Sequence, residues 1–145
     1  MSFPYKRILC PVDFDDTSAI ALREACAIAG LCKATVCLLH VVWINPLATE
    51  GFVLAELQES QSKHARTKVA EMANGVLAGV DHEINIEIGD PAETILAMAE
   101  RTHADLVVMA THGRHGVTRL VMGSVAERIV REATVPVLTI RTHAK

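Results

Sequence analysis

Short apolar runs alternate with longer stretches of helical pattern along the chain. Four of these runs are nearly continuous in Val, Ile and Leu, which is typical of strands covered on both faces of a parallel sheet. They predict strands at residues 6–12, 34–42, 106–110 and 135–140. A fifth run, at residues 82–88, strictly alternates polar and apolar side chains and predicts an edge strand.

Helix signals fill the gaps between the predicted strands. The first helix has its N-cap candidates at residues 15–18, and we expect it to stop at Gly30. A longer helical stretch follows at about residues 50–77 and is closed by Gly79. The position of its first turn is only loosely defined by the pattern.

Capping signals mark the starts of the last two helices. Asp90 and Glu93 form a capping box around Pro91, which suits the first turn of a helix. Ser124 and Glu127 form a second capping box. The helix after it carries one predicted apolar face, made by Ala126, Ile129, Val130 and Ala133.

The order of elements predicts an α/β fold in one domain spanning residues 1–145. If the alternating third strand is an edge and the apolar first and fourth strands are central, right-handed crossovers give a doubly wound, five-stranded parallel sheet with the order 3-2-1-4-5. Helices then cover both faces. The switch point lies between strands 1 and 4, and open α/β sheets bind ligands there, at the carboxyl ends of the strands.

Composition narrows the range of partners. Lys and Arg number 14 against 17 Asp and Glu, so the formal net charge is -3, whereas nucleic-acid binders usually show a basic face. No apolar run approaches the ~20 residues that span a bilayer. The first twelve residues lack the pattern of a signal peptide. We therefore expect a soluble cytoplasmic protein that binds neither nucleic acid nor membranes.

Cysteines and histidines offer weaker candidates for chemistry. Three of the four cysteines (Cys10, Cys26, Cys32 and Cys37) lie in apolar segments and no Cys-x-x-Cys spacing occurs, which predicts reduced, inert core thiols. His40 and His103 lie near apolar segments and are expected to be buried with satisfied hydrogen bonds. His112 and His115 have a metal-like spacing without an evident third ligand, so solvated or phosphate-facing rings are favoured.

The segment after the fourth predicted strand carries the strongest functional signal. Thirteen residues separate that strand from Ser124, whereas α/β connections usually take roughly 2–6 residues. No acidic residue occurs from Leu106 through Ala126, while Arg114 and Arg119 lie among the glycines. Flexible backbone and free N–H groups at a helix start suit a phosphate, which would lie against Gly123, Ser124 and Val125. The alternative is that these residues are only turn and cap residues.

Two further candidates lie at the ends of predicted central strands. Asp13 follows the first strand, where its carboxylate could accept a hydrogen bond from a base amine or a ribose hydroxyl. Its other possible role is to cap the next helix. Val41, near the end of the second strand, could contact a base through its backbone or simply belong to the core.

With these residues, the sequence resembles the nucleotide-binding members of the universal stress protein family. The resemblance covers essentially the whole chain. The phosphate-binding signature of that family is Gly, two residues, Gly, nine residues, Gly, and then Ser or Thr. Gly113, Gly123 and Ser124 match the last three fixed positions, and Ala110 takes the place of the first glycine. A methyl group there costs little unless the backbone needs a positive φ.

The resemblance implies an adenine nucleotide alpha hydrolase-like fold and a set of nucleotide contacts. Pro11, Asp13 and Val41 would line the adenine and ribose, and Met109 and Ala110 would lie by the ribose. The phosphates would be held by the glycine loop and the helix start, with Mg²⁺ carried on them. With Val12 and Arg114 included, the candidate nucleotide-binding residues are Pro11, Val12, Asp13, Val41, Met109, Ala110, Gly113, Arg114, Gly123, Ser124 and Val125.

The function implied is that of a stress-response protein that binds ATP, or ADP or AMP, and acts through nucleotide-dependent conformation or association. No catalytic residue is assigned, so any ATP hydrolysis should be slow. The resemblance also implies a homodimer formed through the last strand.

Other functions are kept as alternatives. Ala110 favours a nucleotide-free interaction module with the same fold. A hydrolase using Ser124, His112 or His115, and Asp13 is disfavoured, because a serine that opens a helix in a glycine loop suits phosphate binding better. An adenylyl-transfer enzyme lacks a catalytic motif here, and a Walker-type loop is excluded because no Gly-Lys-Ser/Thr triplet occurs.

Overall fold

A parallel five-stranded sheet, with the strand order β3-β2-β1-β4-β5, forms the middle of the molecule. The computed structural model describes residues 3–44, 51–111 and 122–141. The elements are β1 (Arg7–Pro11), α1 (Asp16–Cys32), β2 (Thr35–Val42), α2 (Gly51–Ala73), β3 (His82–Ile88), α3 (Pro91–Arg101), β4 (Leu106–Ala110), α4 (Ser124–Glu132) and β5 (Val137–Ile140). This confirms the predicted α/β fold, the strand order and the edge position of β3.

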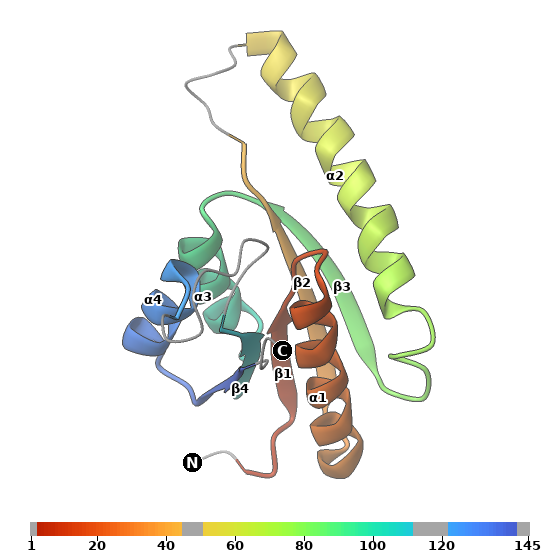
Figure 1. Cartoon of the computed structure of the whole chain (residues 1–145), viewed down its shortest axis with the longest axis vertical. Helices are drawn as coiled ribbons and strands as arrows, with labels where there is room; N and C mark the ends of the chain where they lie inside the picture. Colours follow the sequence, from red (N-terminus) through yellow and green to blue (C-terminus); the bar gives the residue numbers. More distant parts are fainter. Residues whose placement is uncertain (1–2, 45–50, 112–121, 142–145) are drawn as a thin grey trace.

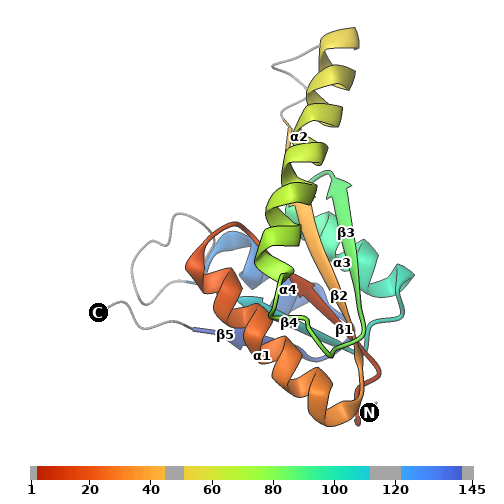
Figure 2. The same ribbon diagram turned by 90° about the vertical axis from the view of Figure 1, so that its right-hand side faces the viewer.

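Helices cover both faces of the sheet (Figures 1 and 2). Alternate residues of the central strands build one core on each face. Ile8 and Cys10 of β1 pack with Leu22 of α1 in the first core, which also takes in α2. Leu9 of β1 packs in the second core with Met98 of α3 and Ile129 of α4. Burial on both faces explains why these strands are almost continuously apolar.

The first half of α2 projects beyond the sheet in both views of the chain (Figures 1 and 2). Its second half is anchored by Ala65, Val69 and Ala73, which are buried against the strands. Among the helices described, none combines the length and the apolar composition that spanning a bilayer requires.

Local hydrogen bonds set the starts of two helices as predicted. Asp15 is the N-cap of α1, and its carboxylate accepts the Ser18 N–H at 2.9 Å. Asp90 is the N-cap of α3 and accepts the Glu93 N–H at 2.9 Å, with Pro91 in the first turn. Each cap satisfies an N–H group that the helix itself leaves unpaired.

Three predicted helix boundaries are wrong. The second helix ends at Ala73 rather than near residue 77, because residues 74–80 form turns in which Gly75 and Gly79 adopt positive φ. The first helix continues through Gly30, because its C-cap is Lys33, which adopts the left-handed conformation at φ 59°. The last helix has Gly123 rather than Ser124 as its N-cap, and no side chain caps its first turn. Ser124 is therefore the first residue of α4, and the capping box predicted for it with Glu127 does not form.

The predicted apolar face of α4 is narrower than expected. Ala126 and Ile129 are buried against the second core, but Val130 is 48% exposed. Helical spacing alone could not show this, because the width of the covered stripe depends on where α3 and the sheet meet the helix.

Truncating Ile129 to Ala should lower the free energy of unfolding by about 2–5 kcal/mol, because the change leaves a cavity in a fully buried position. The matched control, Val130→Ala on the exposed side of the same helix, should change it by less than about 0.5 kcal/mol. Urea unfolding followed by circular dichroism measures both. Equal losses in the two variants would contradict the assigned helix face.

Candidate functional site

The carboxyl ends of β1 and β4 lie side by side, as the predicted switch point requires. These strands pair in register through Ile8 with Leu106 and Leu9 with Val107. The chain leaves β1 toward α1 on one face of the sheet and leaves β4 toward α4 on the other. Diverging connections of this kind open a crevice at the end of a parallel sheet.

The turn after β1 carries Asp13 and is held by both neighbouring elements. The Val12 N–H donates to the Leu39 carbonyl of β2 at 2.8 Å. The Asp13 N–H donates to the hydroxyl of Ser18 at 2.8 Å, and Ser18 is itself a buried residue of α1. Asp13 is half-buried, and because Asp15 caps α1, Asp13 is not the helix N-cap.

The end of β2 contributes Val41 and His40. Val41 is half-buried and packs against the second core. His40 is buried and lies within hydrogen-bonding distance of the Val12 carbonyl, as expected from its sequence surroundings. The same expectation is wrong for His103, which is exposed beyond the end of α3 with a positive φ of 54°. The turn after α3, and not the neighbouring apolar strand, therefore sets the exposure of the His103 side chain.

A backbone hydrogen bond brings the start of α4 to the end of β4. The Gly123 N–H donates to the Thr111 carbonyl at 2.7 Å, and the Gly123 carbonyl accepts the Glu127 N–H at 2.9 Å. The N–H groups of a first helical turn have no intrahelical partner and carry the positive end of the helix dipole. Those of Ser124 and Val125 therefore lie at the same end of the sheet as Asp13.

Met109 and Ala110 close β4 on this side of the crevice. Met109 is buried and Ala110 is half-buried, and Ala110 pairs with Ile140 of β5. Among the described residues other than glycine, a positive φ occurs only at Lys33 and His103. Ala110 thus has extended strand backbone, and the replacement of glycine by alanine brings no conformational strain there.

The structure therefore brings together nine of the eleven predicted site residues at one end of the sheet. Gly113 and Arg114 lie outside the described residues, as do His112 and His115. Within the ranges 3–44, 51–111 and 122–141, no group of three His, Cys, Asp or Glu residues gathers as a metal site would require. Sequence reasoning weighed Ser18 only as a cap candidate and did not connect His40 with this site.

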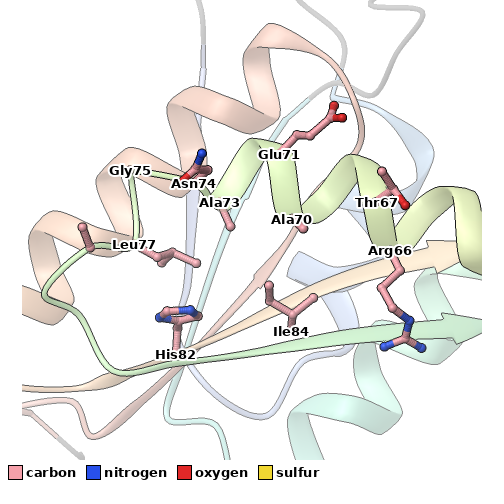
Figure 3. A pocket seen from close by; sticks show the side chains of 11 residues that line it. Arg66, Thr67, Ala70, Glu71, Ala73, Asn74, Gly75, Leu77, His82 and Ile84 are labelled. Atoms are coloured by element: carbon pink, nitrogen blue, oxygen red, sulfur yellow. The ribbon is translucent and has the colours of Figure 1, made fainter.

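An open groove of ≈ 730 Å³ lies elsewhere, between the second half of α2 and the amino-terminal part of β3 (Figure 3). Ala70, Leu77 and Ile84 contribute apolar surface, and Arg66 and His82 lie at its border. None of the predicted site residues lines it. The groove is therefore separate from the crevice at the carboxyl ends of β1 and β4.

The thiols have the environment expected of core residues. Cys10, Cys26 and Cys37 are buried, and burial raises the pKa of each thiol. At Cys37 the nearby Arg7 guanidinium, 3.1 Å from the sulfur, opposes this rise in pKa without cancelling it. Cys32 is half-buried at the end of α1. Raised pKa values keep the three buried thiols protonated and unreactive.

Comparison with known proteins gives a consistent relationship over nearly the full chain. The model of the Universal stress protein family matches residues 4–141. Universal stress protein MJ0531 of Methanocaldococcus jannaschii is 37% identical over 146 residues, covering 97% of this chain and 85% of that protein. The solved structure of MJ0577, from the same organism, is 29% identical with a TM-score of 0.88 and covers 97% of this chain and 99% of its own.

Two more distant solved structures are described with nucleotides. One is a universal stress protein in complex with cAMP, 21% identical with a TM-score of 0.64, covering 96% of this chain and 98% of its own. The other is the protein from Archaeoglobus fulgidus in complex with dAMP, 23% identical with a TM-score of 0.60, covering 94% and 98%. At this identity the likeness shows the shared fold, and the nucleotides belong to those proteins.

Replacing Ser18 with Ala should lower the free energy of unfolding by about 1–3 kcal/mol, because the Asp13 N–H loses its acceptor in a part-buried turn. Ser60→Ala, on an exposed position of α2, is the control and should change it by less than about 0.5 kcal/mol. Urea titration measures both variants. Full stability of the Ser18 variant would show that this bond does not hold the turn.

A thiol reagent such as Ellman's reagent should modify Cys32 first in the folded protein, because the other three thiols are buried and protonated. Cys32→Ser should remove the fast phase of the reaction, and unfolding in urea should expose the remaining thiols. A fast phase that survives in the variant would show that a second thiol is accessible.

Proposed function

The chain belongs to the universal stress protein family, and on that premise we propose that it binds an adenine nucleotide, ATP in the first place, in the crevice between β1 and β4. The observation that carries the proposal is the 2.7 Å hydrogen bond from the Gly123 N–H to the Thr111 carbonyl. It fixes the free N–H groups of α4 at the same end of the sheet as the turn that carries Asp13. One end of the crevice then suits phosphates and the other suits a nucleoside.

The base and ribose would be bound at the ends of β1, β2 and β4. Odd-numbered residues of β2 direct their backbone groups to β1, since the Thr35 N–H donates to Lys6 and the Leu39 carbonyl accepts from Val12. The alternation of a parallel ladder directs the backbone groups of Val41 to the same side, beyond the end of β1. There they suit the polar edge of a base, with Pro11, Val12, Asp13, Met109 and Ala110 around the base and ribose.

The phosphates would be bound by the start of α4 and the segment before it. The N–H groups of Ser124 and Val125 and the hydroxyl of Ser124 supply donors, and the missing side chain of Gly123 leaves room for an oxygen to approach. Its φ of -59° is ordinary, so this glycine is needed for space and not for backbone conformation. Gly113 and Arg114 complete the proposed set, and Mg²⁺ would add positive charge on the phosphates.

The protein would act by nucleotide-dependent conformation or association, with at most slow hydrolysis of ATP. That two proteins of this fold are described with cAMP and dAMP agrees with an adenine nucleotide as ligand. The nucleotide-free alternative rested on Ala110, and the extended backbone at that residue no longer favours it. The proposal treats the chain as one domain, which its single sheet supports. A cytoplasmic location is part of the same proposal and rests on the sequence.

A homodimer through β5 is the second part of the proposal. This strand ends the sheet in the described part of the chain, and its Leu138 is 36% exposed. Even-numbered residues of β5 bond to β4, as the hydrogen bonds to the carbonyls of Pro136 and Ile140 show. The backbone of Thr139 is thus directed to the outer edge, where an unpaired strand offers hydrogen bonds to a second copy.

Nucleotide binding is tested by calorimetric titration of ATP and Mg²⁺ into protein freed of carried-over nucleotide. Gly123→Val should weaken binding about tenfold or more, a change of about 1.4 kcal/mol, because its side chain fills the space assigned to phosphate. Gly30→Val, at an exposed position of α1 with open space around it, should bind as the wild type does. Unchanged affinity in the Gly123 variant would remove the phosphate assignment, and no binding by the wild type would contradict the proposed ligand.

Light scattering coupled to gel filtration tests the dimer. Thr139→Pro removes the N–H directed to the outer edge while sparing the residues that bond to β4, and it should convert a dimer to a monomer. Thr139→Val keeps the N–H group and should remain dimeric. A monomeric wild type would contradict the dimer, and a dimeric proline variant would place the interface elsewhere.

A further inference from the structure

The imidazole of His40 connects the end of β2 to the turn that carries Asp13. Its side chain belongs to a residue that is only 8% exposed, and Nδ1 lies 2.8 Å from the Val12 carbonyl oxygen. The ring stacks on Phe14 with centroids 4.3 Å apart and planes inclined by 26°. His40 therefore contacts both Val12 and Phe14, the residues on either side of Asp13.

The Val12 carbonyl oxygen determines whether Nδ1 of His40 is the donor or the acceptor of this hydrogen bond. A carbonyl oxygen can only accept, so Nδ1 must carry the hydrogen and donate it. We assign the hydrogen to Nδ1 from this contact.

Both polar groups of the Val12–Asp13 peptide are bound by side chains. His40 donates to its carbonyl, and its N–H donates to the hydroxyl of Ser18. The preceding N–H, that of Val12, is bound to Leu39. These three hydrogen bonds fix the plane of the peptide from which the Asp13 side chain departs.

We propose that His40 is a positioning residue for nucleotide recognition, which holds the Val12–Asp13 peptide so that the Asp13 carboxylate meets the nucleoside in a preset orientation. This inference rests on the proposed function, because it concerns the same site. His40 itself does not touch the nucleotide. Its side chain lies on the face of the sheet opposite to that of Val41, since successive residues of a strand point to opposite faces.

Loss of the donor should weaken binding of ATP without abolishing it. A net hydrogen bond is worth about 1 kcal/mol, so a His40→Leu variant, which keeps an apolar side chain of similar size, should bind roughly fivefold more weakly. His40→Asn carries its amide nitrogen at the same distance along the side chain as Nδ1. It should restore most of the affinity, although both variants lose the stacking on Phe14.

A purely structural role would give a different pattern. Val69→Ala truncates a fully buried residue of the same core, contributed by α2, and serves as the control for lost stability. It should lower the free energy of unfolding and leave the dissociation constant for ATP unchanged. If His40 is a positioning residue, the affinity for ATP depends on whether residue 40 has a hydrogen-bond donor. If its role is only packing, the affinity decreases with the stability of each variant.

The experiment measures the dissociation constant of ATP with Mg²⁺ by calorimetry for the wild type and the three variants, with unfolding in urea measured in parallel. Weak binding in His40→Leu with recovery in His40→Asn supports the inference. Equal binding in wild type and His40→Leu overturns it while leaving the proposed function intact, and equal loss in both His40 variants overturns the donor role. A wild type that does not bind ATP overturns the proposed function and this inference with it.

A measurement on the wild type alone covers the case in which the variants fail to fold. Long-range ¹H–¹⁵N correlation spectra of the histidine rings report which nitrogen of His40 carries hydrogen. Hydrogen on Nδ1 is expected. A neutral ring with hydrogen on Nε2 alone would leave the Val12 carbonyl without a donor and would overturn the inference.

Discussion

The central position of β1 is the constraint on which the rest of this structure depends. Because β1 lies between β2 and β4, the chain leaves β1 toward α1 on one face of the sheet, crosses back from β3 to β4 through α3 on the other face, and leaves β4 toward α4 on that second face. Open α/β sheets bind ligands where the strand order reverses, at the carboxyl ends of the strands. The same arrangement that buries β1 in two cores places its carboxyl end at this switch point.

Hydrogen bonds to the backbone hold the described parts of the proposed site in place. On one side, the Val12–Asp13 peptide is bound by His40 and Ser18. On the other, Gly123 is bound to the end of β4 through Thr111. These contacts tie both halves of the proposed site to buried strands, so a ligand would meet groups whose positions are already set. Such preorganisation reduces the entropy that a protein loses on binding.

Sequence patterns predicted the strand order well because burial on two faces and alternation at an edge leave distinct signatures, as β1 and β3 show. The predicted caps at Asp15 and Asp90 also form, since each depends on only three or four neighbouring residues. The errors have two causes. The first helix runs past Gly30 because Lys33, a residue not typical of a left-handed cap, ends it. Val130 remains exposed because tertiary contacts set the width of the covered stripe. The contact between His40 and Val12 joins residues far apart in the chain, so no local pattern could predict it.

A crystal structure of the protein with ATP and Mg²⁺ tests the central claim most directly. The account predicts the base and ribose beside Asp13 and Val41, at the carboxyl ends of β1 and β2, and the phosphates at the amino terminus of α4. Electron density for the nucleotide in the groove between α2 and β3 would contradict the account. So would a bound nucleotide that makes no contact with the residues at the ends of β1, β2 and β4.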